Sequence, residues 1–175
     1  MKNLKYLNLF SKKYKKVLAF DGGGVRAIMG VYFLKKLEEE SSKSIFESFD
    51  LFIGTSAGAT NALMLGMKGS SIKDLEKFWT IENLKRIMNQ SFIDKTSIFQ
   101  TRPKYTNEGK KEVLHNFFEN KKIGQSLKPV VVTAYDLEAR KPILISSYGD
   151  PEVTAVQAAN ASSAAPIYFP TANMK

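Results

Sequence analysis

Short apolar runs alternate with longer segments of helical periodicity along the chain. Val17 to Phe20 is a continuous apolar tetrad between lysines and a glycine-rich stretch, so we expect a buried strand there. Val25 to Glu40 predicts a helix whose charged residues gather at its far end. Its apolar positions at helical spacing are Val25, Ile28, Met29, Tyr32, Phe33 and Leu37. A second apolar run, Phe49 to Ile53, predicts another strand, and the small residues of Ala57 to Met67 predict the helix that follows it.

The second half of the chain continues this alternation. Ser71 to Asn89 predicts two short helices, with Trp79 in the core, and Thr106 to Asn120 predicts a longer one. The β-branched runs Val130 to Thr133 and Ile143 to Ile145 predict two neighbouring strands.

An alanine-rich stretch, Thr154 to Ala165, predicts a last helix that Pro166 ends. Its small side chains let it pass close to another element, and the Ala57 to Met67 helix is the expected neighbour. No internal repeat or low-complexity linker interrupts the 175 residues, which suit one domain with a mixed α/β sheet.

The amino-acid composition excludes some kinds of catalytic and metal-binding site. The chain has no cysteine, which excludes thiolate catalysis and cysteine-ligated zinc, and its single histidine makes a histidine metal site improbable. A formal charge of +9 favours anionic partners without choosing among membranes, nucleic acid and acidic proteins. No signal peptide or transmembrane span is visible, so we expect a cytoplasmic or peripheral membrane location.

Residues 1–16 form a basic N-terminal arm that precedes the domain. Apolar residues interleave with its lysines, which are Lys2, Lys5, Lys12, Lys13, Lys15 and Lys16. Such an arm attracts an anionic membrane, at about 1 kcal/mol per lysine near the surface, or is a solvated lead-in to the first strand.

The motif Gly54-Thr55-Ser56-Ala57-Gly58 joins the second predicted strand to its helix. A serine at the apex of such a turn points its hydroxyl out of the backbone, and glycines on both sides remove Cβ atoms that would clash. Ser56 is therefore a candidate nucleophile. A tight turn with a capping serine gives the same letters for structural reasons, so the motif alone leaves both interpretations open.

Three consecutive glycines, Gly22 to Gly24, join the first strand to its helix. Unobstructed N–H groups beside a helix N-terminus bind an anion. A dinucleotide site would need an acidic residue at the end of another strand, and a P-loop would need a lysine after the glycines; the sequence supplies neither. A glycine loop that precedes a nucleophile turn instead suits an oxyanion hole, whose donors contribute about 3–4 kcal/mol each to acyl transfer.

Three blocks of the sequence resemble the patatin-like phospholipases, lipid acyl hydrolases that use a Ser–Asp dyad without histidine. The blocks are Asp21-Gly22-Gly23-Gly24-Val25-Arg26, Phe49-Asp50-Leu51-Phe52-Ile53-Gly54-Thr55-Ser56-Ala57-Gly58 and Ala161-Ser162-Ser163-Ala164-Ala165-Pro166-Ile167-Tyr168-Phe169-Pro170. Pro103-Lys104-Tyr105 and Thr133-Ala134-Tyr135-Asp136-Leu137 resemble the family's intervening segments, so the likeness covers residues 17–175.

The resemblance implies a three-layer α/β fold, with a mostly parallel central sheet flanked by helices. The residues that it carries over are the nucleophile Ser56, the oxyanion-hole residues Gly22, Gly23 and Gly24, the loop support Arg26, and the elbow residues Gly54, Thr55, Ala57 and Gly58. It leaves open whether Arg26 adds positive charge to the site or forms a structural ion pair. The implied substrates are phospholipids or other lipid acyl esters at an anionic membrane surface, with no metal or other cofactor and no nucleic acid.

In the family, the dyad aspartate lies in an Asp-Gly-Gly or Asp-Gly-Ala segment downstream of the third block. This chain stops at Lys175, just after that block, and its Asp-Gly-Gly at Asp21 belongs to the glycine loop. We therefore expect a domain, residues 17–175, that is truncated before the dyad aspartate and is impaired in turnover. The alternative is a non-catalytic remnant that binds membranes or proteins through its basic surface.

Two further segments invite functional hypotheses. His115 lies in a predicted helix, whereas histidine bases usually lie on loops at strand ends, so we expect a surface or half-buried helical residue rather than a triad member. Phe92 to Tyr105 has no clear period and predicts a loop, with a mobile flap over the acyl pocket as the alternative.

Overall fold

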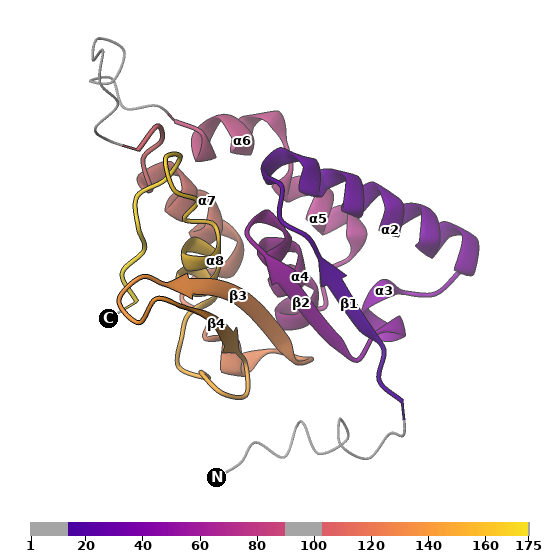
Figure 1. Cartoon of the computed structure of the whole chain (residues 1–175). Coiled ribbons are helices and arrows are strands. Elements are labelled where there is room, and N and C mark those ends of the chain that lie inside the picture. The colour runs from indigo at the N-terminus through magenta and orange to yellow at the C-terminus, as the bar shows by residue number, and fades with distance from the viewer. Residues whose placement is uncertain (1–13, 90–102, 175) are drawn as a thin grey trace.

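A four-stranded sheet forms the centre of the computed structural model, which describes residues 14–89 and 103–174 (Figure 1). Its strands are β1 (Val17–Phe20), β2 (Leu51–Thr55), β3 (Val130–Asp136) and β4 (Lys141–Ser146), in that spatial order. The first three run parallel and β4 runs antiparallel to β3. The four predicted strands are confirmed, and so is the mostly parallel sheet.

The helices follow the predicted order, and α3 is an additional short helix that the sequence pattern does not predict. They are α2 (Ala27–Ser41), α3 (Ile45–Ser48), α4 (Ala57–Lys68), α5 (Ile72–Phe78), α6 (Ile81–Ile87), α7 (Glu108–Phe118) and α8 (Ala155–Ser162), with short 3-10 turns at Gly24–Arg26 and Ile123–Gln125. A capping box between Thr154 and Gln157 starts α8. This helix ends at Ser162, with Ser163 as its C-cap, and so stops short of the predicted Ala165.

Helix α4 lies at the centre of the hydrophobic core. Every residue from Ala57 to Met67 is buried, and the helix packs on β1, β2 and β3. Helix α8 packs on β3 and on α4, which confirms the predicted neighbour, so the two helices share one face of the sheet (Figure 1). Close approach is possible because a small residue such as Gly66 lets the backbone of α4 lie against Phe52 and Val130.

Two expectations about burial are wrong. Strand β1 is an edge strand rather than a buried one, since Val17 is 45% exposed and Ala19 is also exposed. Helix α2 turns Val31 and Leu34 into the core. The predicted apolar positions Val25, Met29, Tyr32, Phe33 and Leu37 are exposed, because apolar residues occur on two sides of this helix and its periodicity does not choose between them.

The register of the parallel strands brings the two loops that follow β1 and β2 to the same end of the sheet. Phe20 pairs with Gly54, so the glycine loop after β1 and the turn after β2 leave the sheet side by side. Thr55 pairs with Thr133 on β3, and their hydroxyl oxygens are 2.8 Å apart. Parallel strands place their carboxyl ends together, and ligands of open α/β sheets bind at that edge.

Candidate active site

Ser56 occupies the turn between β2 and α4. Its backbone has φ 54° and ψ −123°, a positive-φ conformation that a residue with a side chain adopts only at a strain of about 1–3 kcal/mol. The residue is half-buried. In the described part of the chain, the Ser56 Oγ makes no hydrogen bond.

The two glycines of the motif are required by close packing of the backbone. A Cβ on Gly54 would lie 2.6 Å from the Cα of Ala59, on the first turn of α4. A Cβ on Gly58 would lie 2.5 Å from the main-chain oxygens of both Phe20 and Asp21. Both positions therefore exclude any side chain, and the second fixes the start of α4 against the end of β1.

The glycine loop lies directly against the serine. A Cβ on Gly22 would come within 3.3 Å of the Ser56 Cβ. Gly23 and Gly24 have φ of 151° and 58°, which favour glycine. Among the described residues, no acceptor receives the N–H of any of these three glycines. The structure thus brings the loop and the serine together and leaves N–H groups beside them.

Arg26 supports this loop from within. Its backbone N–H and its Nε both donate to the carbonyl oxygen of Gly23, at 3.3 Å and 3.5 Å. Its side chain is otherwise exposed and forms no ion pair with any residue in the described ranges. The ion-pair interpretation of Arg26 is therefore not seen among these residues.

The third sequence block reaches the same turn from α8. The backbone N–H of Ser56 donates to the Oγ of Ser162 at 2.7 Å. Beyond α8, the chain is held by backbone bonds from Lys104 to Ile167 and from Tyr105 to Tyr168. The motifs identified in the sequence thus meet around Ser56. The sequence pattern does not single out Ser162; its one signal is a hydroxyl in a helix of small residues.

A buried polar bridge ties the glycine-loop helix to the serine helix. Asn61 on α4 is fully buried; its Nδ2 donates to the carbonyl of Ala27, and its Oδ1 accepts from the Trp79 indole N–H at 2.8 Å. Trp79 is 6% exposed, which confirms it as a core residue. The bridge fixes the first turn of α2, which follows the loop.

His115 and two aspartates, Asp136 and Asp150, are groups that could act as a base, and none of them hydrogen-bonds to Ser56. His115 is exposed on α7. Asp136 accepts the N–H groups of Glu138 and Ala139, so it caps the turn between β3 and β4. Asp150 accepts from Ser146, which pairs with Val131 near the start of β3 and thus lies at the opposite end of the sheet. No described carboxylate or imidazole hydrogen-bonds to Ser56.

A buried lysine next to the third block was not expected from the sequence. Lys110 on α7 is 3% exposed; its Nζ donates to the Ser163 carbonyl at 3.3 Å and lies 4.0 Å from the centroid of the Phe169 ring. Burial, and then the charge of Lys111, lower the pKa of Lys110 to about 8.

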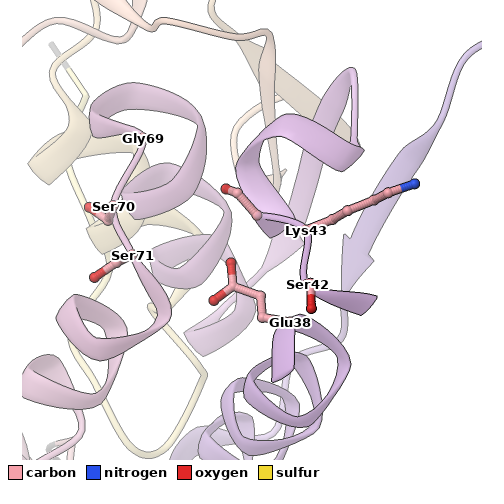
Figure 2. A pocket seen from close by; sticks show the side chains of 7 residues that line it. Glu38, Ser42, Lys43, Gly69, Ser70 and Ser71 are labelled. Carbon is pink, nitrogen blue, oxygen red and sulfur yellow. The ribbon is translucent and has the colours of Figure 1, made fainter. Parts of the chain in front are cut away.

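A depression of about 400 Å³ lies elsewhere, between the end of α2 and the junction of α4 and α5 (Figure 2). Its lining includes Glu38, Ser42, Lys43, Ser70 and Ser71, and it is at the C-terminal end of α4, whereas Ser56 precedes the N-terminal end. In residues 14–89 and 103–174, no three His, Asp or Glu side chains gather to hold a metal ion. No helix of these ranges has the length and apolarity to cross a membrane.

A strained serine between a parallel strand and a buried helix, on a mixed α/β sheet, is typical of serine hydrolases. A sequence model of one such group, Patatin-like phospholipase, matches residues 18–175. The chain therefore belongs to the patatin-like phospholipase family.

Curated relatives agree with this assignment. Patatin-like protein 4 of Arabidopsis thaliana is 31% identical over 95% of this chain and 45% of its own length. The cGAMP-activated phospholipase of Pseudomonas aeruginosa is 31% identical over 89% of this chain and 48% of its own. Patatin-15 of Solanum tuberosum is 27% identical over 88% and 43%. The chain thus spans less than half the length of these relatives.

The fold is shared with a solved structure. The type III effector protein ExoU superposes with a TM-score of 0.51 at 15% sequence identity, over 87% of this chain and 40% of that one. At this identity the likeness concerns the fold: a mostly parallel sheet flanked by helices.

Proposed function

We propose that this chain carries the nucleophile and the oxyanion-binding loop of a lipid acyl hydrolase. The observation that supports the proposal is the strained Ser56, whose Cβ lies against Gly22 and whose hydroxyl has no partner in the described residues. The glycine loop next to this serine carries N–H groups that have no acceptor among the described residues, and such donors would stabilise the negative charge of a tetrahedral intermediate. The patatin-like relatives support a lipid ester as the substrate class.

The reaction would pass through an acyl-enzyme. The Ser56 Oγ attacks the ester carbonyl carbon, the carbonyl oxygen takes the negative charge, and the N–H groups of Gly22, Gly23 and Gly24 stabilise it. The hydroxyl proton leaves to a base and the alcohol departs with a proton. Water then hydrolyses the acyl-serine, so one ester and one water give one acid and one alcohol. Arg26 holds the loop in shape through the Gly23 carbonyl.

The described site has a candidate nucleophile but no identified general base to accept its proton. No carboxylate or imidazole among the described residues hydrogen-bonds to Ser56, so we propose slow turnover by the 175-residue chain itself. Loss of a member of a catalytic triad typically lowers turnover on the order of 10⁴-fold or more. Oxyanion stabilisation survives such a loss and retains about 10³–10⁴-fold catalysis over water.

A fluorophosphonate probe tests the nucleophile separately from the base, because it reacts with the serine without needing hydrolysis afterwards. We expect the purified chain to be labelled once per molecule, with the adduct on the peptide that contains Ser56, and Ser56→Ala to abolish labelling. Ser70→Ala, which removes a hydroxyl at the other end of α4, is the matched control and should label normally.

The outcome also decides between hydrolase and binding module. Absence of labelling in the folded chain, or labelling that persists in Ser56→Ala, contradicts the assignment of the nucleophile. The first of these results would favour a non-catalytic patatin-like module. Fast hydrolysis of p-nitrophenyl esters that Ser56→Ala removes would instead show that a base is present in the chain.

A further inference from the structure

We propose that Ser162 is a positioning residue for the nucleophile, which it holds in the strained turn by accepting the backbone N–H of Ser56. The inference rests on the proposed role of Ser56. It assigns a function to the third sequence block, whose helix α8 ends at Ser162.

The hydrogen bond accounts for the backbone of Ser56. The carbonyl oxygen of Ser56 accepts the N–H of Ala59 at 2.9 Å and so belongs to the first turn of α4. Its N–H follows the last β2 residue, Thr55, and is taken by the Ser162 Oγ at 2.7 Å. Both backbone groups of Ser56 are thereby hydrogen-bonded, and within residues 14–89 and 103–174 its hydroxyl is the one polar group without a partner.

The surroundings of Ser162 determine where its hydroxyl lies. Helix α8 starts at the Thr154 capping box and packs on β3 and α4. Directly after it, the Ser163 carbonyl accepts from the buried Lys110, and Asn107 donates to the carbonyl of Pro170. The acceptor is therefore anchored on both sides, and it belongs to the scaffold rather than to a free loop.

No neighbouring group in the described chain substitutes for this hydroxyl. Ala161 carries no acceptor on its side chain. The Ser163 Oγ turns back to its own helix and donates to the carbonyl of Ala159 at 2.7 Å. Removing the Ser162 hydroxyl therefore leaves the N–H of the half-buried Ser56 without this acceptor. The backbone of Ser56, strained at φ 54°, then loses a hydrogen bond that offsets part of the strain.

The test compares Ser162→Ala, Ser162→Thr and the control Ser163→Ala in the 175-residue chain. The first readout is the second-order rate of fluorophosphonate labelling at Ser56. We expect Ser162→Ala to lower it by about tenfold, the factor that one net hydrogen bond is worth, and Ser162→Thr to restore most of the rate. Ser163→Ala should leave it within about twofold, since its bond lies within α8.

The second readout is hydrogen exchange of the Ser56 amide, measured by NMR at a pH where exchange is slow. It should accelerate in Ser162→Ala by at least about tenfold and remain protected in Ser163→Ala and Ser162→Thr. A general loosening of α8 would instead accelerate the amides of Ala158 and Ser163, whose bonds to Thr154 and Ala159 report on the helix itself.

The possible failures are distinguishable. If Ser56→Ala leaves labelling of the otherwise unchanged chain intact, the proposed nucleophile is wrong. If Ser56→Ala abolishes labelling but Ser162→Ala labels at the normal rate, the positioning role alone is overturned. If Ser162→Thr labels as slowly as Ser162→Ala while protecting the Ser56 amide, the bond exists but does not position the nucleophile.

Discussion

Gly22 and Ser56 lie in contact at the carboxyl ends of the parallel strands: a Cβ built on Gly22 would lie 3.3 Å from the Cβ of Ser56 and 3.4 Å from the carbonyl oxygen of Thr55. The glycine loop and the serine turn come from different strands, β1 and β2, and the pairing of Phe20 with Gly54 brings them together. A methyl group at position 22 would therefore press on the nucleophile before it disturbed the core.

Gly22→Ala should lower the reactivity of Ser56 more than it lowers stability. Contacts of 3.3–3.4 Å are tight but close to what neighbours can accommodate, so we expect a loss of no more than about 1–2 kcal/mol in the free energy of unfolding. Fluorophosphonate labelling should fall by at least about tenfold, because small displacements of reacting groups are costly.

Gly30→Ala is the control for that substitution. A Cβ there would meet an ordinary contact, 3.9 Å from the Phe20 ring, and the position is inside α2. Alanine should therefore stabilise the helix by about 0.5–1 kcal/mol and leave labelling unchanged. Equal labelling of the Gly22→Ala and Gly30→Ala variants would contradict the close relation between the glycine loop and the nucleophile.

Gly58→Ala should instead unfold the protein or destabilise it severely. Its Cβ would overlap main-chain oxygens at 2.5 Å, and backbone atoms of buried elements cannot move aside as a flexible side chain does. We expect a loss of about 3 kcal/mol or more in urea denaturation followed by circular dichroism. A variant of normal stability would mean that α4 starts further from β1 than described.

The sequence predicted the strand, turn and helix around Ser56 well because most of their constraints are local. Gly54 and Gly58 are required by contacts within the turn and with the adjacent strand, and the apolar runs that flank them have ordinary strand and helix periods. The same holds for β3 and β4, which are neighbours in sequence and in the sheet.

Long-range and directional features could not be predicted in this way. Ser56 and Ser162 are 106 positions apart, and nothing local in either segment specifies their hydrogen bond. Helix α2 carries apolar residues on two sides, so the buried pair Val31 and Leu34 is chosen by tertiary packing. The sequence around Lys110 is typical of a solvated lysine on a helix. Lys110 is buried because α7 packs against the third block.

Asn61→Leu should destabilise the protein by about 1–3 kcal/mol, because the buried Trp79 N–H loses its acceptor while the branched shape of the side chain is kept. The chain has one tryptophan, so a change in intrinsic fluorescence reports directly on this site. In a Trp79→Phe background the same substitution should be less damaging, since Phe has no N–H to leave unpaired. Equal losses in both backgrounds would show that the Trp79–Asn61 hydrogen bond contributes nothing.

The basic arm remains a prediction, since residues 1–13 lie outside the described residues. If its lysines dock the protein on lipid, vesicles that contain phosphatidylglycerol should bind it better than phosphatidylcholine vesicles. Binding should weaken as salt rises, because the Debye length falls from about 10 Å at 0.1 M to about 3 Å at 1 M. Deleting residues 1–13 keeps Lys16, whose backbone bonds to Asp50 and Leu51, and undiminished binding by that variant would contradict the arm's role.

Lys110 gives the stability of the protein a specific pH dependence. Its pKa is about 8 in the folded chain, against 10.5 for an ordinary lysine, because burial disfavours the ammonium and Lys111 adds to this. Between these two values the unfolded chain binds more protons than the folded one, so folding stability rises with pH in this window. Below pH 8 the buried charge opposes folding in full, by an amount on the order of 3 kcal/mol.

Lys110→Met keeps the length of the side chain and removes the charge. At pH 7 it should raise the free energy of unfolding by about 1–3 kcal/mol, the lower end applying if the contact with the Phe169 ring offsets part of the burial penalty. The gain should shrink as pH rises from 8 and be nearly gone at 10.5, where Lys110 is neutral in the folded chain and half deprotonated in the unfolded one. Lys111→Met, at an exposed neighbouring position, should show a much smaller gain, confined to relief of its repulsion with Lys110. Urea unfolding of the three proteins from pH 7 to 10.5 measures these differences in stability. If Lys110→Met is less stable than the native chain at pH 7, the contacts of the ammonium with Ser163 and Phe169 outweigh its desolvation.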